Sequence, residues 1–144
     1  MEIDIVAHCR LNPAVRVKGI RQPEGFDTAG KRIIQLPCPE AVCFGLNRRE
    51  NTKDQFDFPN YRRFCRNLFL PYADMIEMLA EEGHTIRITG IPKSPSCGAL
   101  TVSVGGKVGK GISFEDRTQA GKGIFFEEIE KELNRRRILF EMTE

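Results

Sequence analysis

The chain has 144 residues, of which 40% are hydrophobic and 29% charged, and its formal net charge is +2. This length predicts a single domain over residues 1–144, and the ordinary composition excludes fibrous and largely disordered classes. Its 22 basic and 20 acidic residues are interspersed, so the basic stripe of a nucleic-acid binder is missing. Because no apolar run is long enough to span a bilayer and the first residues lack a secretory pattern, we expect a cytoplasmic protein without nucleic-acid or membrane partners.

The first half of the sequence predicts two short strands. Residues 3–7 form a β-prone run that stops at His8-Cys9, ahead of a turn at Asn12-Pro13. Residues 32–36 form the second run, which Pro37-Cys38-Pro39 closes because a proline cannot donate to a strand ladder. The glycine, proline and charges of residues 19–31 predict an exposed connection between the two strands.

The second half predicts helices, a third strand and a hairpin. Apolar residues recur at steps of three and four from Asn60 to Ala80, but Pro71 predicts either two helices or one kinked helix. The remaining elements are a strand over 85–91, a hairpin of 101–104 with 107–108 around a glycine pair, a helix over 123–137 and a closing strand over 138–142.

Alternation of short strands with helix-length segments predicts an α/β fold. We expect a mostly parallel, Rossmann-like or flavodoxin-like sheet covered by helices, with a small hairpin. Ligands of such sheets bind beyond the carboxyl ends of the strands. Cys9, Cys38 and Cys97 each follow one predicted strand, so all three are expected at the same edge of the sheet.

Three converging thiolates repel one another unless a cation compensates their charge, which points to a metal centre. A zinc ion with an open fourth position is one interpretation. An iron-sulfur cluster held by three cysteines is another, and its fourth iron would be free to bind a sulfur atom. Buried cysteines without a metal remain the third interpretation, because cysteine is among the most buried residue types.

The motifs around these cysteines resemble the DUF523 family, which includes the thiouracil desulfidases. The resemblance covers most of the chain and rests on Cys9, on Cys38-Pro39-Glu40 and, most specifically, on Ser94-Pro95-Ser96-Cys97-Gly98. It implies a 4Fe-4S cluster, held by the three cysteines, whose open iron binds a thiocarbonyl sulfur. The expected reaction is removal of sulfur from a small thiolated, thiouracil-like compound by non-redox hydrolysis.

The resemblance also implies roles for two other residues. Glu40 would act as general base or proton shuttle, and Ser96 would orient the substrate or relay a proton, with Ser94 as the substitute candidate.

Cys43 is a further candidate as fourth ligand or sulfur relay, whereas Cys65 and His8 are interpreted as structural. We expect a monomer or weak homodimer.

A function without catalysis is the alternative to an enzyme. A zinc or iron-sulfur module could act as a structural or sensing domain without turnover. Closed structural sites take four protein ligands, whereas a three-ligand site leaves room for chemistry. A cysteine-nucleophile enzyme would need a histidine near its thiol, and His8 is the histidine that lies close to one of these cysteines in sequence.

Overall fold

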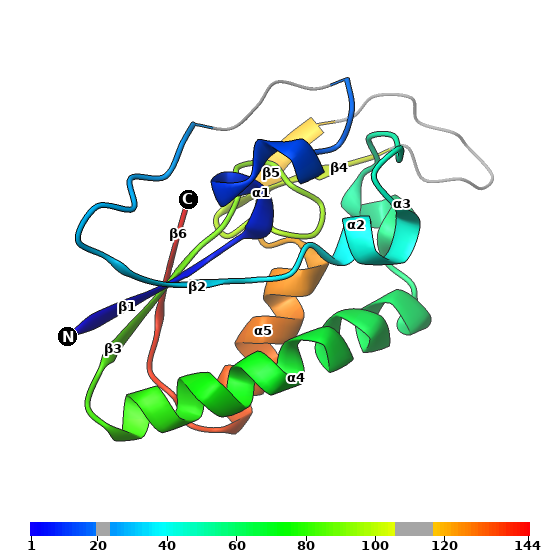
Figure 1. The fold of residues 1–144 in the computed structure, drawn as a ribbon. Helices are drawn as coiled ribbons and strands as arrows, with labels where there is room; N and C mark the ends of the chain where they lie inside the picture. The colour runs from blue at the N-terminus through cyan, green and yellow to red at the C-terminus, as the bar shows by residue number, and fades with distance from the viewer. Residues whose placement is uncertain (20–23, 106–116) are drawn as a thin grey trace.

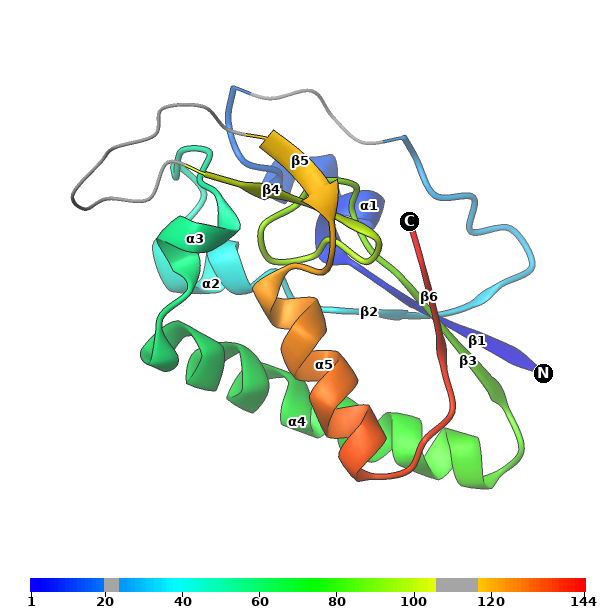
Figure 2. The ribbon, with the colours of Figure 1, turned by 180° about the vertical axis from the view of Figure 1, so that it is seen from behind.

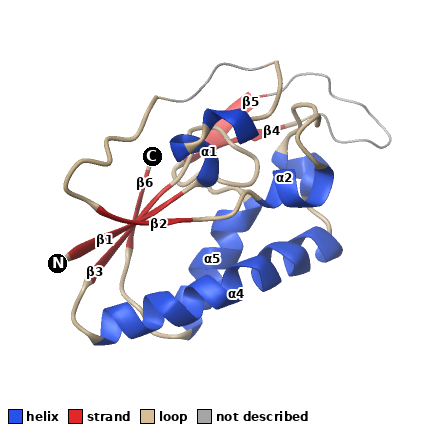
Figure 3. Cartoon of the chain, viewed as in Figure 1, coloured by secondary structure: helices blue, strands red, loops and turns tan. Residues whose placement is uncertain are grey.

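The computed structural model describes residues 1–19, 24–105 and 117–144. Its main sheet contains four parallel strands in the order β2-β1-β3-β6, and a separate antiparallel sheet pairs β4 with β5 (Figures 1 and 3). The predicted α/β class with a mostly parallel sheet and a small hairpin is therefore confirmed. The strands are β1 (Glu2–Val6), β2 (Arg32–Gln35), β3 (Thr85–Thr89), β4 (Thr101–Val104), β5 (Arg117–Ala120) and β6 (Glu141–Thr143).

The helices differ greatly in length. Two long helices, α4 (Pro59–Glu81) and α5 (Ile124–Arg135), pack against each other on the same face of the main sheet (Figures 1 and 2). The short helices are α1 (His8–Leu11), the 3-10 turn η1 (Pro13–Val15), α2 (Pro39–Phe44) and α3 (Lys53–Phe56). No helix in the described part of the chain is both long and apolar enough to cross a membrane.

The core lies between the sheet and the two long helices. Ile5 of β1 and Ile88 of β3 are fully buried and pair in register at the centre of the sheet. Phe69 of α4 and Phe125 of α5 are also fully buried, with their rings edge to face at 6.3 Å. Burial of such side chains contributes about 1.5–3 kcal/mol each. This burial stabilises the packing of the two long helices on the sheet.

Pro71 does not divide the long helix. It lies inside α4, which is continuous from Pro59 to Glu81, so the prediction of two separate helices is wrong. Pro71 and Asn67 are both exposed. The carbonyl of Asn67, which loses its helical donor because Pro71 has no N–H, can therefore bind water, and this keeps the interruption tolerable.

The hairpin was predicted only in part. Strand β4 matches residues 101–104, but its partner is β5, which the sequence analysis did not find. All four residues of β5 are exposed, so it carries no alternation of apolar and polar side chains. The predicted second arm at 107–108 lies outside the described residues. The α1, α2 and hairpin elements lie beyond the carboxyl ends of β1, β2 and β3 (Figure 1).

Candidate functional site

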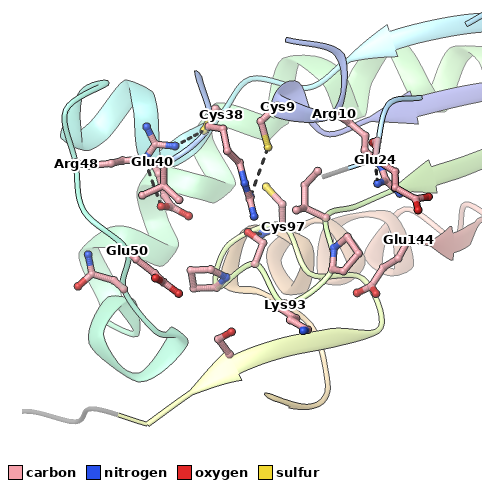
Figure 4. Close-up of a pocket in the computed structure, with 18 residues that line it drawn as sticks. Cys9, Arg10, Glu24, Cys38, Glu40, Arg48, Glu50, Lys93, Cys97 and Glu144 are labelled. Atoms are coloured by element: carbon pink, nitrogen blue, oxygen red, sulfur yellow. Dashed lines mark hydrogen bonds and ion pairs between the residues drawn. The ribbon is translucent and has the colours of Figure 1, made fainter. Parts of the chain in front are cut away.

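A pocket of about 810 Å³ lies beyond the carboxyl ends of the first three strands, and Cys9, Cys38 and Cys97 all line it (Figure 4). Cys9 lies in α1, directly after β1, and Cys38 precedes α2 after β2. Cys97 lies in the turn that follows β3. The chain passes from β1 to β2 on one side of the sheet and from β3 to β6 on the other side. The place between β1 and β3 is therefore a topological switch point, where open parallel sheets bind ligands.

Cys38 is the N-cap of α2. Its Sγ accepts the backbone N–H of Ala41 at 3.4 Å, in the way that a serine or aspartate oxygen caps a helix. Pro39 occupies the first position of the helix, where its fixed φ is favourable and its missing N–H costs nothing. The sequence Cys-Pro-Glu therefore begins a helix, and it places Glu40 in the first turn, one residue after the proline.

The Cys97 turn depends on three glycines. A Cβ at Gly98 would lie 2.8 Å from the carbonyl oxygen of Ser94, and a Cβ at Gly123 would lie 2.5 Å from that of Ser96. A Cβ at Gly90 would overlap the carbonyl oxygen of Cys97. Real Cβ atoms do not approach other atoms this closely, so the backbone around Cys97 can pack here only against glycine.

Hydrogen bonds fix the same turn to the rest of the fold. Ser94 Oγ accepts the N–H of Cys97 at 3.0 Å. The first amides of α5 donate to the turn, from Ile124 to the carbonyl of Pro95 at 2.8 Å and from Phe126 to that of Ser96 at 3.1 Å. These bonds satisfy N–H groups that a helix start leaves unpaired. The Cys97 side chain is therefore presented by a rigid turn.

Two arginines donate to the cysteine sulfurs. Arg16 Nη1 lies 3.8 Å from Cys9 Sγ, and Arg48 Nη2 lies 3.7 Å from Cys38 Sγ. Arg48 also donates through Nε to Glu40 Oε1 at 3.4 Å and through Nη2 to the carbonyl of Val15 at 2.8 Å. The pocket therefore places positive charge beside two sulfurs, and one guanidinium joins Cys38 to Glu40.

Burial raises the pKa of all three thiols. For Cys9 the increase is opposed by the charge of Arg16, and for Cys38 by the Ala41 N–H and by Arg48. Cys97 is the most deeply buried, and burial together with the neighbouring Cys38 and Cys9 raises its pKa well above the ordinary value. Burial therefore disfavours thiolates here, and additional positive charge near the sulfurs would favour them.

The structure brings together five of the residues singled out from the sequence. Glu40 and Ser94 line the pocket with the three cysteines, and Glu40 is buried. Ser96 does not line it, because its side chain is fully buried and its Oγ lies 2.8 Å from Tyr61 Oη.

The other cysteines and the histidines lie apart from this group. Cys43 is exposed on α2 and Cys65 is buried in the core, and neither lines the pocket. His8 was expected at the end of a strand but lies in the helical turn α1, and it lines a separate, smaller pocket. Cys38 also lines that smaller pocket, but no hydrogen bond joins His8 to a cysteine among the described residues.

Sequence reasoning missed several residues of the pocket. Lys93 and Glu144 line it, and Gly90 packs against the Cys97 turn. Lys93 adopts a positive φ of 65°, which is rare outside glycine. The Pro92-Lys93-Ser94-Pro95 punctuation indicated a turn, but no feature of the sequence marked Glu144.

Among the described residues, no group of three His, Cys, Asp or Glu side chains is arranged to hold a single metal ion. This finding does not decide between zinc and an iron-sulfur cluster, because cysteine thiolates hold both.

The fold and the pocket together define a class: an α/β domain whose parallel sheet carries a three-cysteine pocket at its carboxyl edge. Within that class, the chain belongs to the family of a Methanocaldococcus jannaschii protein named "Uncharacterized protein MJ0003". The two are 30% identical over 137 residues, which cover 90% of this chain and 78% of the archaeal protein. No family model and no solved structure matches the chain.

Proposed function

We propose that this chain is an iron-sulfur-dependent desulfidase related to the DUF523 family. In this proposal, Cys9, Cys38 and Cys97 hold a 4Fe-4S cluster, and the pocket admits a small thiolated compound. The carrying observation is that three cysteines from three strand ends line one pocket that also contains a carboxylate. The proposed place of action is the cytoplasm, which keeps thiols reduced.

The donor set of the pocket supports a cluster with thiolate ligands. Each of the three positions supplies a sulfur, and hydrogen-bond donors already face two of them, from Arg16 to Cys9 and from Arg48 to Cys38. The Ala41 N–H adds a further donor to Cys38. Donors to ligand sulfurs and nearby positive charge stabilise an anionic cluster and adjust its potential. A three-ligand cluster bound here would supply an open iron that acts as a Lewis acid toward sulfur.

The proposed reaction is hydrolysis of a thiocarbonyl group. The carbon–sulfur bond breaks, water supplies the oxygen of the new carbonyl, and sulfur leaves as hydrogen sulfide. No electrons are gained or lost, so no external reductant is needed. Substrate atoms and water balance with the carbonyl product and hydrogen sulfide.

Glu40 is the residue best suited to accept the proton of water. It lines the pocket, and its ion pair with Arg48 holds the carboxylate in one position beside Cys38. A general base must lie within hydrogen-bond reach of the attacking water, and a buried side chain held by a neighbour satisfies the requirement for fixed geometry. Ser94, rather than Ser96, is the serine with access to the pocket.

The first experiment is anaerobic purification followed by reconstitution with iron and sulfide. We expect broad visible absorption and about four irons and four acid-labile sulfides per chain, as a 4Fe-4S cluster contains. A colourless protein without iron or acid-labile sulfide after reconstitution would reject the cluster. Zinc bound in its place would favour the other metal.

The second experiment measures sulfide release from a panel of thiolated bases and thioamides. We expect the reconstituted protein to release sulfide with at least one of them, and Glu40→Gln to lose most of this activity while keeping its iron. Glu50→Gln is the matched control, because Glu50 lines the same pocket without an ion pair among the described residues. A loaded protein that releases no sulfide from any compound would favour a sensing or structural module.

A further inference from the structure

Three consecutive backbone amides donate to one oxygen of Glu144, a carboxylate that lines the pocket. Ala99, Leu100 and Thr101 donate their N–H groups to Glu144 Oε1 at 3.2, 2.8 and 2.7 Å. The Thr101 hydroxyl donates to the same carboxylate, with Oγ1 at 3.2 Å from Oε1 and 3.1 Å from Oε2. We call this set of donors from residues 99–101 the amide nest. Successive N–H groups of this kind form concavities that bind anions.

The amide nest binds the side chain of Glu144, which lines the cysteine pocket, whereas residues 99–101 themselves do not line it. Glu144 lines that pocket together with Lys93, whose backbone N–H donates to Thr101 Oγ1 at 3.0 Å. Figure 4 shows Glu144 on one side of the pocket and Arg48 and Glu40 on the other, with Cys9 and Cys97 between them. An anion that takes the place of the Glu144 carboxylate would therefore lie at the border of the pocket, at the end away from Glu40.

Cationic groups of the pocket are left without carboxylate partners. Lys93, Arg10 and Arg16 line it, and none of them forms an ion pair within the described residues, although Arg10 donates to the carbonyl of Glu24 at 3.2 Å. The Nε atoms of Arg10 and Arg16 are buried and have no hydrogen-bond partner in the described part of the chain. Leaving a buried donor unpaired is costly, and a bound anion would relieve that cost.

Strand β6 is attached to the sheet independently of the Glu144 side chain. The carbonyl of Thr143 accepts the N–H of Gly90 at 2.9 Å, and Met142 packs against the hydrophobic core. Strand pairing also joins Thr143 to Thr89. Because these contacts hold the backbone, the Glu144 carboxylate can leave the nest by side-chain rotation, and the strand stays in place.

We infer that the amide nest is the anion subsite of this pocket, where Glu144 acts as an internal stand-in that the carboxylate or phosphate of a small ligand displaces. The N–H and hydroxyl groups that donate to the Glu144 carboxylate could donate in the same way to the carboxylate or phosphate of a ligand. Anionic ligands would bind with this group in the nest, and their remaining part would extend toward the cysteines. The inference concerns anion binding and stands apart from the proposed sulfur chemistry.

The test adds inorganic phosphate to the whole chain. NMR of the backbone amides and calorimetry then measure the binding of phosphate. We expect weak phosphate binding to the wild type and about tenfold tighter binding to Glu144→Ala, since the internal competitor is gone. Phosphate should shift the amide signals of residues 99–101 first. The same titration with acetate tests whether the nest also binds a carboxylate. If Glu144→Ala unfolds, Glu144→Gln replaces it in both titrations.

Two controls make the result specific. Glu50→Ala removes a carboxylate from the same pocket outside the nest, and its phosphate affinity should equal that of the wild type. Adding Thr101→Val to Glu144→Ala removes the hydroxyl donor at nearly constant shape and should weaken phosphate binding several-fold. Equal gains in Glu50→Ala and Glu144→Ala would overturn the inference. So would phosphate binding that leaves the amide signals of residues 99–101 unmoved, or no binding to either variant of Glu144.

Discussion

Arg48 donates through Nη2 to Cys38 Sγ at 3.7 Å, so a guanidinium whose side chain is only 7% exposed lies against a proposed ligand sulfur. The same group forms the ion pair with Glu40, whose side chain is 10% exposed. Charge on the sulfur and charge on the proposed base are therefore balanced by one residue. Its replacement should affect stability and catalysis together.

Arg48→Met is expected to destabilise the metal-free protein by about 3 kcal/mol, because it leaves the Glu40 carboxylate buried without its partner. Urea unfolding followed by circular dichroism measures this change. Arg49→Met is the matched control, since Arg49 is exposed and its side chain forms no bond among the described residues. That control should change stability by less than about 0.5 kcal/mol. Equal losses in both variants would contradict the importance of the buried pair.

Gly123→Ala is expected to destabilise the fold by about 2 kcal/mol or more, because the new Cβ would meet the carbonyl oxygen of Ser96 and the nitrogen of Cys97 at 2.5 and 2.7 Å. Displacement of the Cys97 turn should also reduce the iron that the reconstituted protein retains. The comparison is Gly25→Ala, where a Cβ would meet nothing within 4 Å. Thermal unfolding and iron analysis of both variants decide the matter, and a stable Gly123→Ala protein with full iron would argue against a rigid turn.

Local patterns predicted the strands and the cysteine edge because these features are written in short stretches of sequence. The apolar runs before Cys9, Cys38 and Cys97 each form a strand, and parallel pairing then brings their ends together. Strand β5 could not be predicted in this way. Its exposed residues pair with β4 through backbone hydrogen bonds, which leave no side-chain pattern.

The two catalytic candidates show a similar division. Glu40 was selected for its position beside Cys38, and the start of α2 does direct it into the pocket. Ser96 was selected from the same kind of motif, yet the turn directs it toward Tyr61 and leaves Ser94 in the pocket. Within a tight turn, neighbouring side chains point in directions that spacing alone does not specify. Glu144 lies more than 40 residues from the amides it binds, so no local pattern could reveal it.

Replacing Cys9, Cys38 or Cys97 singly by alanine should remove most of the iron and acid-labile sulfide from the reconstituted protein, since each cysteine supplies one of three proposed ligands. Cys43→Ala should retain the full content, because Cys43 is exposed and outside the pocket. Cys65→Ala tests burial alone and should lower stability without changing the iron content. A loss of iron in Cys43→Ala as large as in Cys9→Ala would assign Cys43 a ligand role.

Replacing Ser94 and replacing Ser96 by alanine should have different effects on stability, iron retention and sulfide release. Ser94→Ala removes the acceptor of the Cys97 N–H and leaves a buried donor unpaired, which costs about 1–3 kcal/mol. We expect lower iron retention and lower sulfide release from this variant. Ser96→Ala removes the partner of the Tyr61 hydroxyl, and Tyr61→Phe removes the other half of the same bond. If Ser96 is structural, these two variants should lose similar stability and keep sulfide release per bound cluster, whereas a selective loss of release in Ser96→Ala would restore it as a catalytic candidate.

Acid stability should depend on Glu132 of α5. Hydrogen bonds from Arg135 hold the pKa of this carboxyl below its ordinary value, more strongly than burial raises it. A folded-state pKa below the unfolded value means that the stabilisation is complete above the unfolded pKa of about 4.3 and is lost as pH falls through the folded pKa. Wild type should therefore lose more stability than Glu132→Gln between about pH 5 and pH 3, when urea unfolding is measured across this range. Glu81→Gln, an exposed change in α4, should keep the slope of the wild type, and an unchanged slope in Glu132→Gln would show that the Arg135 contact does not persist in solution.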